Sequence, residues 1–315
     1  MPTVLITGST GFVGSYLVNS LLECSDLVIK IAVRQSVDMN GPICFEVGDI
    51  NPLTDFSSAV TKTDVVIHLA ARAHVMNNSS VDPLSEFRAV NTGGTLNLAR
   101  QAAKAGVKRF IFLSSIGVNG VNNTVPFSVY DSPAPVEDYA VSKFEAEVGL
   151  RRIATETGME VVIIRPPLVY GSNAPGNFGK LARLTSKNIP LPFGAINNKR
   201  SLISLDNLVD LIVTCIDHPK AANQTFLVSD DYDVSTTKLL SLMALAAGKK
   251  PRLIPVPVSV LRLIGRFTGK LAVLDRLCGN LQVDISHTKK TLGWNPPVSF
   301  QNGIQKCFCK EQKDD

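Results

Sequence analysis

Six short apolar runs, separated for the most part by longer segments with helical spacing, limit the folds open to this chain. The runs are rich in β-branched residues and show no alternation of apolar and polar side chains, which is typical of buried parallel strands. They occupy residues 3–7, 27–33, 43–47, 65–70, 109–115 and 160–166. Segments 11–23, 84–106 and 140–158 carry apolar residues at helical spacing. We therefore predict an α/β fold with a doubly wound parallel sheet.

A glycine-rich turn follows the first of these runs. Gly8, Gly11 and Gly14 fall at G-x-x-G-x-x-G spacing, with Phe12 and Val13 between the last two, where a strand passes into an amphipathic helix. This spacing allows a tight turn, close approach of the backbone to a pyrophosphate and close packing of helix on strand. The helix N-terminus adds free N–H groups and a positive dipole end. The sequence predicts a dinucleotide site here, rather than a merely structural turn.

The chain changes character after about residue 170. Residues 171–180 are rich in Gly, and Pro-punctuated connections follow at 188–194, 251–259 and 293–297. We predict an NAD(P)-binding Rossmann domain over residues 1–170. Residues 171–315 are expected to form mainly a smaller C-terminal substrate-binding lobe, with some segments returning to the first domain.

Composition and charge argue against several other functions. The net charge is +5 and the basic residues are scattered, which does not indicate a nucleic-acid-binding surface. Six cysteines without a C-x-x-C pair, together with only four histidines, do not predict a metal site. The N-terminus runs straight into a strand without the features of a signal peptide, so we expect a cytoplasmic protein with reduced thiols.

The most apolar late segment, residues 253–277, is interrupted by Arg262, Arg266, Lys270 and Asp275. It therefore does not predict a membrane span. Its periodicity fits an amphipathic helix packed on a domain, which we favour over loose attachment to a membrane.

The residue after the second strand should distinguish the two nicotinamide cofactors. A carboxylate there binds the ribose 2′-hydroxyl of NAD, whereas an arginine accepts the 2′-phosphate of NADP. This position holds Arg34, and no carboxylate follows until Asp38. We predict NAD or NADP and favour NADP, although a solvated arginine beside the adenine would look the same. Asp49 and Ile50 follow the third strand, where Asp49 can accept a hydrogen bond from the adenine amino group.

Further positions border the expected cofactor. Ala70, Ala71 and Arg72 follow the fourth strand, and small side chains there let a cofactor lie against the backbone. Asn91 lies on the next helix, where it is either a helix-packing residue or part of the site.

The expected chemical centre combines a strand end with a helix. Ser114 and Ser115 end the fifth strand at the carboxyl edge, where ligands of open α/β sheets bind. Tyr139 and Lys143 are four residues apart on a helix, so their side chains share a face. A lysine ammonium and an oxidised nicotinamide would lower the pKa of the tyrosine from its usual value of about 10. Tyr139 could then exchange a proton with an alcohol oxygen that Ser115 holds, while a hydride moves to or from the cofactor.

In this order the motifs resemble those of extended short-chain dehydrogenase/reductases, in the nucleotide-sugar epimerase/dehydratase superfamily. The resemblance covers nearly the full length, in "TGSTGFVG", "GDI", "HLAAR", "NTGGT", "FLSSIGVNG", "YAVSK", "RPPLVYG" and "DISHTKKTLGWNPP". It implies Ser115, Tyr139 and Lys143 as the catalytic trio, with Lys143 also holding the nicotinamide ribose. It also implies that Asn91 supports Lys143 through water.

The resemblance further implies residues around the nicotinamide and the substrate. Ser114 and the segment from Pro166 to Val169 would flank the nicotinamide. Asn177 in "PGNF" and Arg200 in "RSLISLDN" match positions that contact the substrate's nucleotide diphosphate. An arginine suits this role because its fork binds oxygens bidentately; the alternative for Arg200 is a pair with Asp206. His74 could touch the sugar, although a surface or helix-capping role is the simpler interpretation.

Some positions depart from the patterns of particular relatives. Dehydratases resembling this chain carry an acidic pair where it has Ile116 and Gly117, which disfavours elimination of water. UDP-galactose 4-epimerases usually have a tyrosine near the position of Asn119 and an asparagine near that of Leu168. These differences, with Arg34, favour a UDP-(N-acetyl)hexosamine-type 4-ketoreductase/dehydrogenase that acts by hydride transfer in polysaccharide biosynthesis.

Two alternatives remain open at this point. The first is a UDP-hexose 4-epimerase that keeps its NAD bound, and the second is a non-catalytic NAD(P)-sensing regulator, which would be expected to have a broken Tyr/Lys pair. By analogy with such proteins we also expect a homodimer, through the helices that contain Asn91 and Tyr139.

Overall fold

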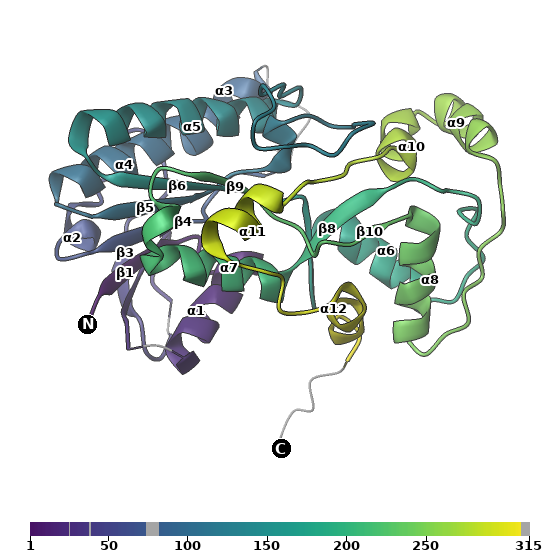
Figure 1. Ribbon diagram of the computed structural model, residues 1–315, viewed down its shortest axis with the longest axis horizontal. Helices are drawn as coiled ribbons and strands as arrows, with labels where there is room; N and C mark the ends of the chain where they lie inside the picture. The colour runs from purple at the N-terminus through teal and green to yellow at the C-terminus, as the bar shows by residue number, and fades with distance from the viewer. Residues whose placement is uncertain (25, 38, 74–81, 310–315) are drawn as a thin grey trace.

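The computed structural model describes residues 1–24, 26–37, 39–73 and 82–309, and its larger part is built on a parallel sheet (Figure 1). The seven strands follow the order β3-β2-β1-β4-β5-β6-β9, all parallel. They are β1 (Thr3–Thr7), β2 (Val28–Val33), β3 (Ile43–Glu46), β4 (Val65–His68), β5 (Arg109–Leu113), β6 (Glu160–Arg165) and β9 (Thr225–Leu227). The six predicted runs all become strands, in the order of a Rossmann fold, and this confirms the predicted fold class.

Helices cover both faces of this sheet (Figure 1). On one face, α1 (Phe12–Cys24) packs against α7 (Leu205–Asp217), and α11 (Ser286–Leu292) lies against β9. On the other face lie α2 (Ser57–Val60), α4 (Thr95–Lys104) and α5 (Asp138–Thr157). Each face has its own apolar core, as expected for strands that are buried on both sides.

The predicted helix over residues 84–106 is divided into three parts. It consists of α3 (Pro83–Phe87), a wide π-type turn η1 (Arg88–Gly94) and α4. An added Cβ at Gly94 would lie 2.5 Å from Ile50 Cγ2, and one at Gly93 would lie 2.6 Å from Pro52 Cγ. The two glycines therefore let the turn pack directly on the segment after β3. Such π turns are frequent at functional sites.

A second, three-stranded sheet in the order β10-β8-β7 forms the smaller part of the molecule. Its strands are β7 (Leu168–Tyr170), β8 (Arg200–Ser204) and β10 (Asp233–Val234). The helices around it are α6 (Gly176–Ser186), α8 (Thr236–Ala246), α9 (Val258–Phe267), α10 (Leu271–Cys278) and α12 (Phe300–Lys306). Short 3₁₀ turns are η2 (Ile116–Val118) and η3 (Pro219–Ala221). In the core of this part, Phe178 stacks on Tyr170 and Phe300 meets the Tyr170 ring edge to face.

Segments from beyond residue 171 also belong to the large sheet, since α7, β9 and α11 all pack on it. The boundary predicted at residue 170 stays a prediction. Among the described residues, no helix is long and apolar enough to cross a membrane.

Candidate active site

The glycine turn after β1 leaves no room for side chains. Gly8 has a φ of +74°, and an added Cβ there would lie 2.6 Å from the Ala70 nitrogen. An added Cβ at Gly14 would lie 2.0 Å from the Gly8 carbonyl oxygen. The Gly11 N–H donates to that same oxygen at 3.0 Å, which closes the turn just before α1 begins. The geometry matches the predicted demand for a tight turn with helix and strand in close contact.

Ser9, inside this turn, provides an independent indication of a ligand. Its side chain is buried, and its Oγ has no hydrogen-bond partner in the part of the chain that the structure describes. Buried hydroxyls are normally hydrogen-bonded, so an orphan in a phosphate-type turn calls for a partner from outside the chain. Together with the tight glycine turn at the N-terminus of α1, this unpartnered hydroxyl fits a dinucleotide pyrophosphate.

Phe12 and Val13 begin α1 and are half-buried. Both pack against the core on the α1 face of the large sheet, and Phe12 also packs against the core of the smaller part. They therefore anchor the glycine turn between the two parts of the molecule.

Two residues expected to contact the adenosine end of the cofactor form an ion pair with each other. Arg34 directly follows β2, and its Nε lies 2.7 Å from Asp49 Oδ1. Both side chains are 77% exposed, so solvent screens this contact between the guanidinium expected to bind a 2′-phosphate and the Asp49 carboxylate. Ile50, the next residue, is half-buried and lies against Gly94 of the π-type turn.

Asn91 is fully buried in the π-type turn and holds the segment after β4 in place. Its Oδ1 accepts from the Arg72 N–H at 2.9 Å, and its Nδ2 donates to the Arg72 carbonyl at 3.0 Å. The same Nδ2 donates to Ser142 Oγ at 3.0 Å. Asn91 therefore fixes the backbone beside Ala70 and Ala71 directly and reaches the α5 helix one residue before Lys143.

Lys143 and Tyr139 lie on the same face of α5, as their spacing predicts. Lys143 is 1% exposed, and its Nζ donates to the Leu113 carbonyl at the end of β5 at 2.9 Å. This Nζ lies 4.4 Å from the centre of the Phe112 ring and 6.0 Å from the centre of the Tyr139 ring. Ser115 lies just after β5, and its Oγ accepts from the Gly117 N–H at 3.1 Å. The structure thus places the predicted trio at one carboxyl edge of the sheet.

Electrostatics at this centre differ from the sequence expectation. Burial raises the pKa of Tyr139 to about 12, whereas the expectation was a lowered value. Burial also lowers the pKa of Lys143 to about 7, and the nearby Glu147 carboxylate opposes this shift. The sequence does not reveal how deeply the pair is buried, and in the protein by itself burial outweighs the attraction between ammonium and phenolate. Lys143 is therefore the group that can change its protonation near neutrality.

A buried ion pair behind the trio was not predicted. Glu147 accepts from Arg165 Nε at 2.9 Å and Nη2 at 2.5 Å, and from Ser114 Oγ at 2.6 Å. Arg165 also donates to Asn119 Oδ1 at 2.9 Å. Glu147 stands four residues after Lys143, which was the available sequence signal, but its partner Arg165 lies on another element. The network fixes Ser114, because the hydroxyl of this serine donates its hydrogen bond to Glu147.

His68, at the end of β4, is a second residue that sequence reasoning missed. It is fully buried between Thr7 Oγ1, at 2.6 Å from Nδ1, and Thr95 Oγ1, at 2.9 Å from Nε2. Burial, and secondarily the charge of Lys143, lower the pKa of His68 to about 3. It is a neutral link between β1, β4 and α4 beneath the glycine turn.

The segment after β6 runs beside the trio. The Pro166 carbonyl accepts from the Ile116 N–H at 2.9 Å, next to Ser115. Val169 lies in β7 and pairs with Ile203 of β8. The expected place of this segment next to a nicotinamide stays a prediction.

The two residues expected to hold a nucleotide diphosphate come from separate elements of the smaller part. Asn177 is exposed in the first turn of α6. Arg200 begins β8, and its Nη1 donates to the carbonyls of Arg276 at 2.6 Å and Gly279 at 3.2 Å. It does not pair with Asp206, which accepts from Tyr16 Oη at 2.9 Å and Lys306 Nζ at 2.6 Å. The local ion pair considered for Arg200 is therefore wrong. His74 lies outside the described residues.

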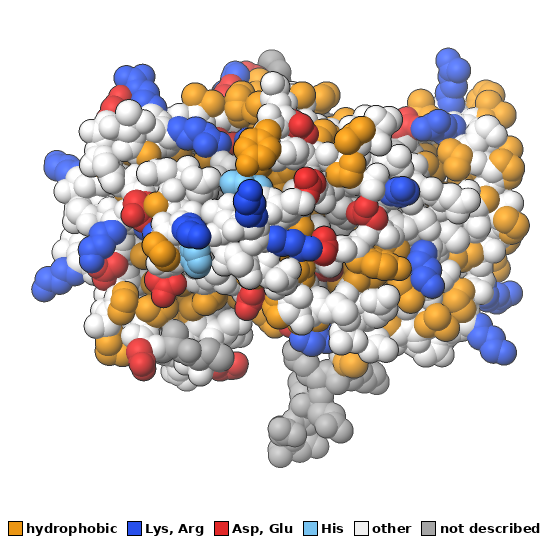
Figure 2. Space-filling model, viewed as in Figure 1, with side chains coloured by type: hydrophobic (Ala, Val, Ile, Leu, Met, Phe, Trp, Pro, Cys, Tyr) orange, Lys and Arg blue, Asp and Glu red, His pale blue; other side chains and the backbone are white. Residues whose placement is uncertain are grey.

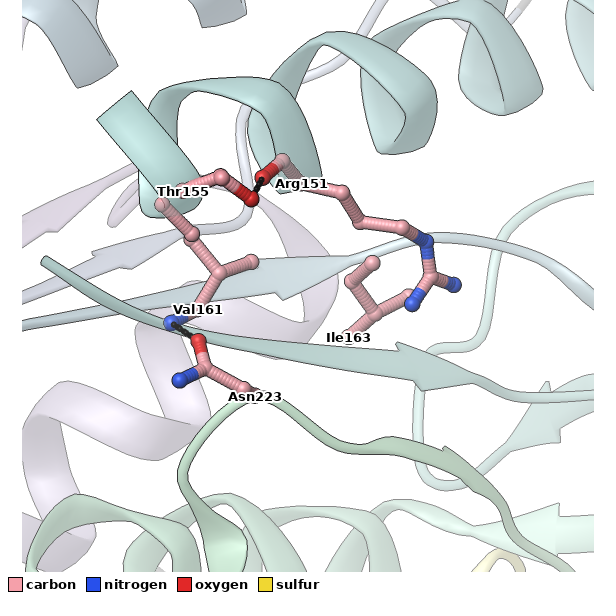
Figure 3. A pocket seen from close by; sticks show the side chains of 6 residues that line it. Arg151, Thr155, Val161, Ile163 and Asn223 are labelled. Atoms are coloured by element: carbon pink, nitrogen blue, oxygen red, sulfur yellow. Dashed lines mark hydrogen bonds between the residues drawn. The ribbon is translucent and has the colours of Figure 1, made fainter. Parts of the chain in front are cut away.

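A cavity of about 340 Å³ lies elsewhere, at the C-terminal half of α5 (Figure 3). Its lining includes Arg151, Thr155 and Asn223 and none of the predicted site residues. The Asn223 Oδ1 accepts from the Val161 N–H at 3.1 Å, and Arg151 donates to Thr225 Oγ1 at 2.8 Å. Because these polar groups already have partners within the chain, we assign the cavity no part in the site.

Comparisons with known proteins agree with this geometry. The sequence profile of the "NAD dependent epimerase/dehydratase family" matches residues 4–229. The chain is 56% identical over 307 residues to a UDP-glucose 4-epimerase of Vibrio cholerae, covering 96% of this chain and 94% of that protein. It is 27% identical over 330 residues to an N-acetyl-α-D-glucosaminyl-diphospho-ditrans,octacis-undecaprenol 4-epimerase of Escherichia coli O157:H7, covering 99% and 97%.

Among solved structures, the chain resembles UDP-glucuronic acid 4-epimerase from Bacillus cereus in complex with NAD. The TM-score is 0.78 at 21% identity, and the match covers 97% of each chain. At this identity the likeness concerns the fold.

Proposed function

Since this chain belongs to the NAD-dependent epimerase/dehydratase family, we propose that it is a UDP-hexose 4-epimerase with tightly bound NAD. The observation that carries the proposal is the 56% identity, over 96% of the chain, to the Vibrio cholerae UDP-glucose 4-epimerase. This comparison favours the epimerase over the 4-ketoreductase that the sequence alone favoured. The differences at Asn119 and Leu168 do not count strongly against it, since Asn119 serves the buried network through Arg165.

The site residues suggest how such a reaction would proceed. NAD, when bound, would accept a hydride from carbon 4 of the sugar and return it to the other face of the ketone. Tyr139 would take the proton of the 4-hydroxyl and give it back, and Ser115 would hold the same oxygen by a hydrogen bond. Lys143 is held by the Leu113 carbonyl. When Lys143 is protonated, its positive charge would lower the pKa of Tyr139, which burial has raised.

The choice of NAD over NADP rests on Arg34. Its Nε lies 2.7 Å from Asp49, so a carboxylate stands beside the arginine that would have to accept a 2′-phosphate. A phosphate would be repelled by that carboxylate, whereas an uncharged ribose hydroxyl can donate a hydrogen bond to it. We therefore propose NAD as the cofactor, in place of the NADP favoured by the sequence.

The substrate's diphosphate would be held by Asn177 and Arg200. The guanidinium of Arg200 is already oriented by two backbone carbonyls, so its remaining N–H groups are available without a competing carboxylate. We also propose a homodimer through the helices that contain Asn91 and Tyr139, which size measurement in solution would test.

Two measurements test the proposed reaction. The purified protein should release NAD when denatured, and it should convert UDP-glucose to UDP-galactose without added cofactor. A 4-ketoreductase would instead consume NADPH with a 4-keto-sugar nucleotide, and that result would refute the proposal. Tyr139→Phe should lose most activity while keeping its NAD, since it removes only the proton-transfer group. An unaffected biological role in that variant would instead support the sensing regulator.

A sugar joined through a diphosphate to a polyprenol is a second candidate substrate, because the Escherichia coli relative is named for one. The exposed apolar residues of the α9–α10 pair favour this possibility because they offer a place for a lipid, and the Arg276 carbonyl of α10 accepts from Arg200. Assays with UDP-sugars and with polyprenyl-diphosphate sugars would separate the two.

A further inference from the structure

Helix α9 exposes the apolar stripe that an amphipathic helix normally buries. Val260, Leu263, Ile264 and Phe267 fall at i, i+3, i+4 and i+7, which is one face of a helix. Phe267 is 82% exposed, and the other three are between 42% and 55% exposed. Isolated exposed apolar residues are common, but a complete stripe of them indicates an interaction surface.

The packing of α9 and α10 explains why this stripe remains outside. The two helices form a hairpin in which an added Cβ at Gly265 would lie 2.5 Å from Leu274 Cδ1. The Arg262 Nε donates to Asp275 Oδ1 at 2.9 Å across the same hairpin. Only Leu261 and Gly265 of α9 are buried, and no residue of α10 is. The described part of the chain thus buries the other side of α9 and leaves its apolar stripe half to largely exposed.

Exposed apolar residues of α10 extend the stripe. We call the set the α9–α10 surface; it consists of Val260, Leu263, Ile264, Phe267, Leu271 and Val273. Figure 2 shows hydrophobic side chains together with Lys and Arg side chains at the end of the molecule where Figure 1 places these helices.

The charge of this segment is strongly one-sided. Residues 249–276 contain seven basic residues and a single acidic one, Asp275. The segment therefore carries more positive charge than the net +5 of the whole chain. Arg266 and Lys270 are exposed next to the apolar residues. Apolar residues bordered by lysines and arginines are the pattern of helices that lie in the interface of anionic bilayers.

The C-terminal end of α10, which follows this surface in the chain, lies close to the candidate active site. Arg276 in α10 contacts Glu137, two residues before Tyr139, at 2.5 Å, and its carbonyl accepts from Arg200. A surface bound there would therefore face the substrate side of the molecule.

We propose that the α9–α10 surface docks the protein on an anionic lipid bilayer. The apolar stripe enters the boundary between headgroups and acyl chains, and the basic residues contact lipid phosphates. A second copy of this chain is a poorer occupant, because a symmetric contact would bring two strongly basic segments together. Docking does not depend on which sugar nucleotide the enzyme uses.

The test is co-sedimentation of the full-length protein with vesicles. Vesicles of phosphatidylcholine mixed with phosphatidylglycerol should bind the protein, vesicles of phosphatidylcholine alone should bind it weakly, and salt should reduce binding. The double variant Leu263→Ser/Phe267→Ser should bind about tenfold more weakly. The control is Leu53→Ser, because Leu53 is 91% exposed outside the α9–α10 surface, and this variant should bind like the unaltered protein.

The charge contribution has its own matched pair. Arg266→Glu/Lys270→Glu should weaken binding to the anionic vesicles, whereas Lys104→Glu, on α4, should not. Circular dichroism and urea unfolding show that each variant is folded, which these exposed positions allow. The proposal is overturned if the unaltered protein does not sediment with anionic vesicles, or if the double variant binds as well as the control. The proposal is also overturned if the unaltered protein is a dimer that does not bind vesicles and Phe267→Ser makes it a monomer. In that case the α9–α10 surface joins two copies of the chain.

Discussion

Replacing Glu147 with Gln should destabilise the protein far more than the same substitution on the surface of the same helix. Glu147 is fully buried and accepts three hydrogen bonds, two of them from Arg165, which is 4% exposed through its side chain. Glu147→Gln keeps the volume but leaves the guanidinium without a counter-charge. Breaking one side of a buried ion pair costs about 3–5 kcal/mol. We expect the lower end, about 3 kcal/mol, because glutamine retains one acceptor oxygen.

Glu156→Gln is the matched control for this substitution. Glu156 pairs with Arg152 one turn from the end of α5, at 2.6 Å, but both side chains are largely exposed. Solvent screens such a pair, so no measurable change is expected. The free energy of unfolding would be measured by urea titration followed by circular dichroism. Equal unfolding midpoints for the two variants would refute the idea that the Glu147–Arg165 pair supports the strand end at Ser114.

A second readout separates a role in the site from general stability. The Glu147 carboxylate raises the pKa of Lys143 against the larger effect of burial, which leaves it at about 7. Removing that charge should lower the pKa of Lys143 further. The limb of the pH–rate profile that follows Lys143 should then move to lower pH in Glu147→Gln and stay in place in Glu156→Gln.

Three further predictions concern other parts of the site. Burial lowers the pKa of His68 from 6.5 to about 3. As the pH falls between these two values, His68 therefore binds a proton in the unfolded chain and does not bind one in the folded chain. Relative to His68→Gln, the unaltered protein should thus lose up to about 1.4 kcal/mol of stability per pH unit below about pH 6.5 in urea titrations, and a constant difference would contradict this. Gly14→Ala places a Cβ 2.0 Å from the Gly8 oxygen, so the purified variant should contain little NAD; an undiminished NAD content would argue against the turn as its site. Asp49→Asn frees Arg34 from its carboxylate and should raise the affinity for NADP relative to NAD in fluorescence titrations, whereas an unaltered ratio would show that the pair does not select the cofactor.

Six of the seven strands of the large sheet could be predicted because each is a local pattern, whereas the short β9 (Thr225–Leu227) was not predicted. A strand such as Thr3–Thr7 corresponds to a continuous apolar run in the sequence. A helix such as Asp138–Thr157 corresponds to a segment with apolar residues at helical spacing. The relative placement of Tyr139 and Lys143 followed from helical geometry alone. The glycine turn was equally local, since its steric requirements involve neighbours in the sequence and one strand beside it.

What could not be predicted depends on pairs that are far apart in the sequence. The partner of Arg34 is Asp49, which follows the next strand, and the proposal of NAD in place of NADP rests on this contact. Asn91 sits in a π-type turn that interrupts a continuous helical pattern, and its partner is the backbone of Arg72. The four-residue spacing between Lys143 and Glu147 is visible in the sequence. The contact between Glu147 and Arg165 is not, because it forms only when the chain folds. Burial, which sets the direction of the Tyr139 pKa, likewise follows from tertiary packing.

The proposed reaction requires that a hydride leave carbon 4 and return to the same sugar. The most direct measurement mixes UDP-glucose that carries both deuterium at carbon 4 and ¹³C throughout its glucose ring with unlabelled UDP-glucose, without added cofactor, and determines by mass spectrometry which UDP-galactose molecules carry deuterium. We predict that the deuterium stays at carbon 4 of the molecules that began with it. Loss of the deuterium, its appearance in molecules that began without it, or the absence of UDP-galactose would contradict the proposal.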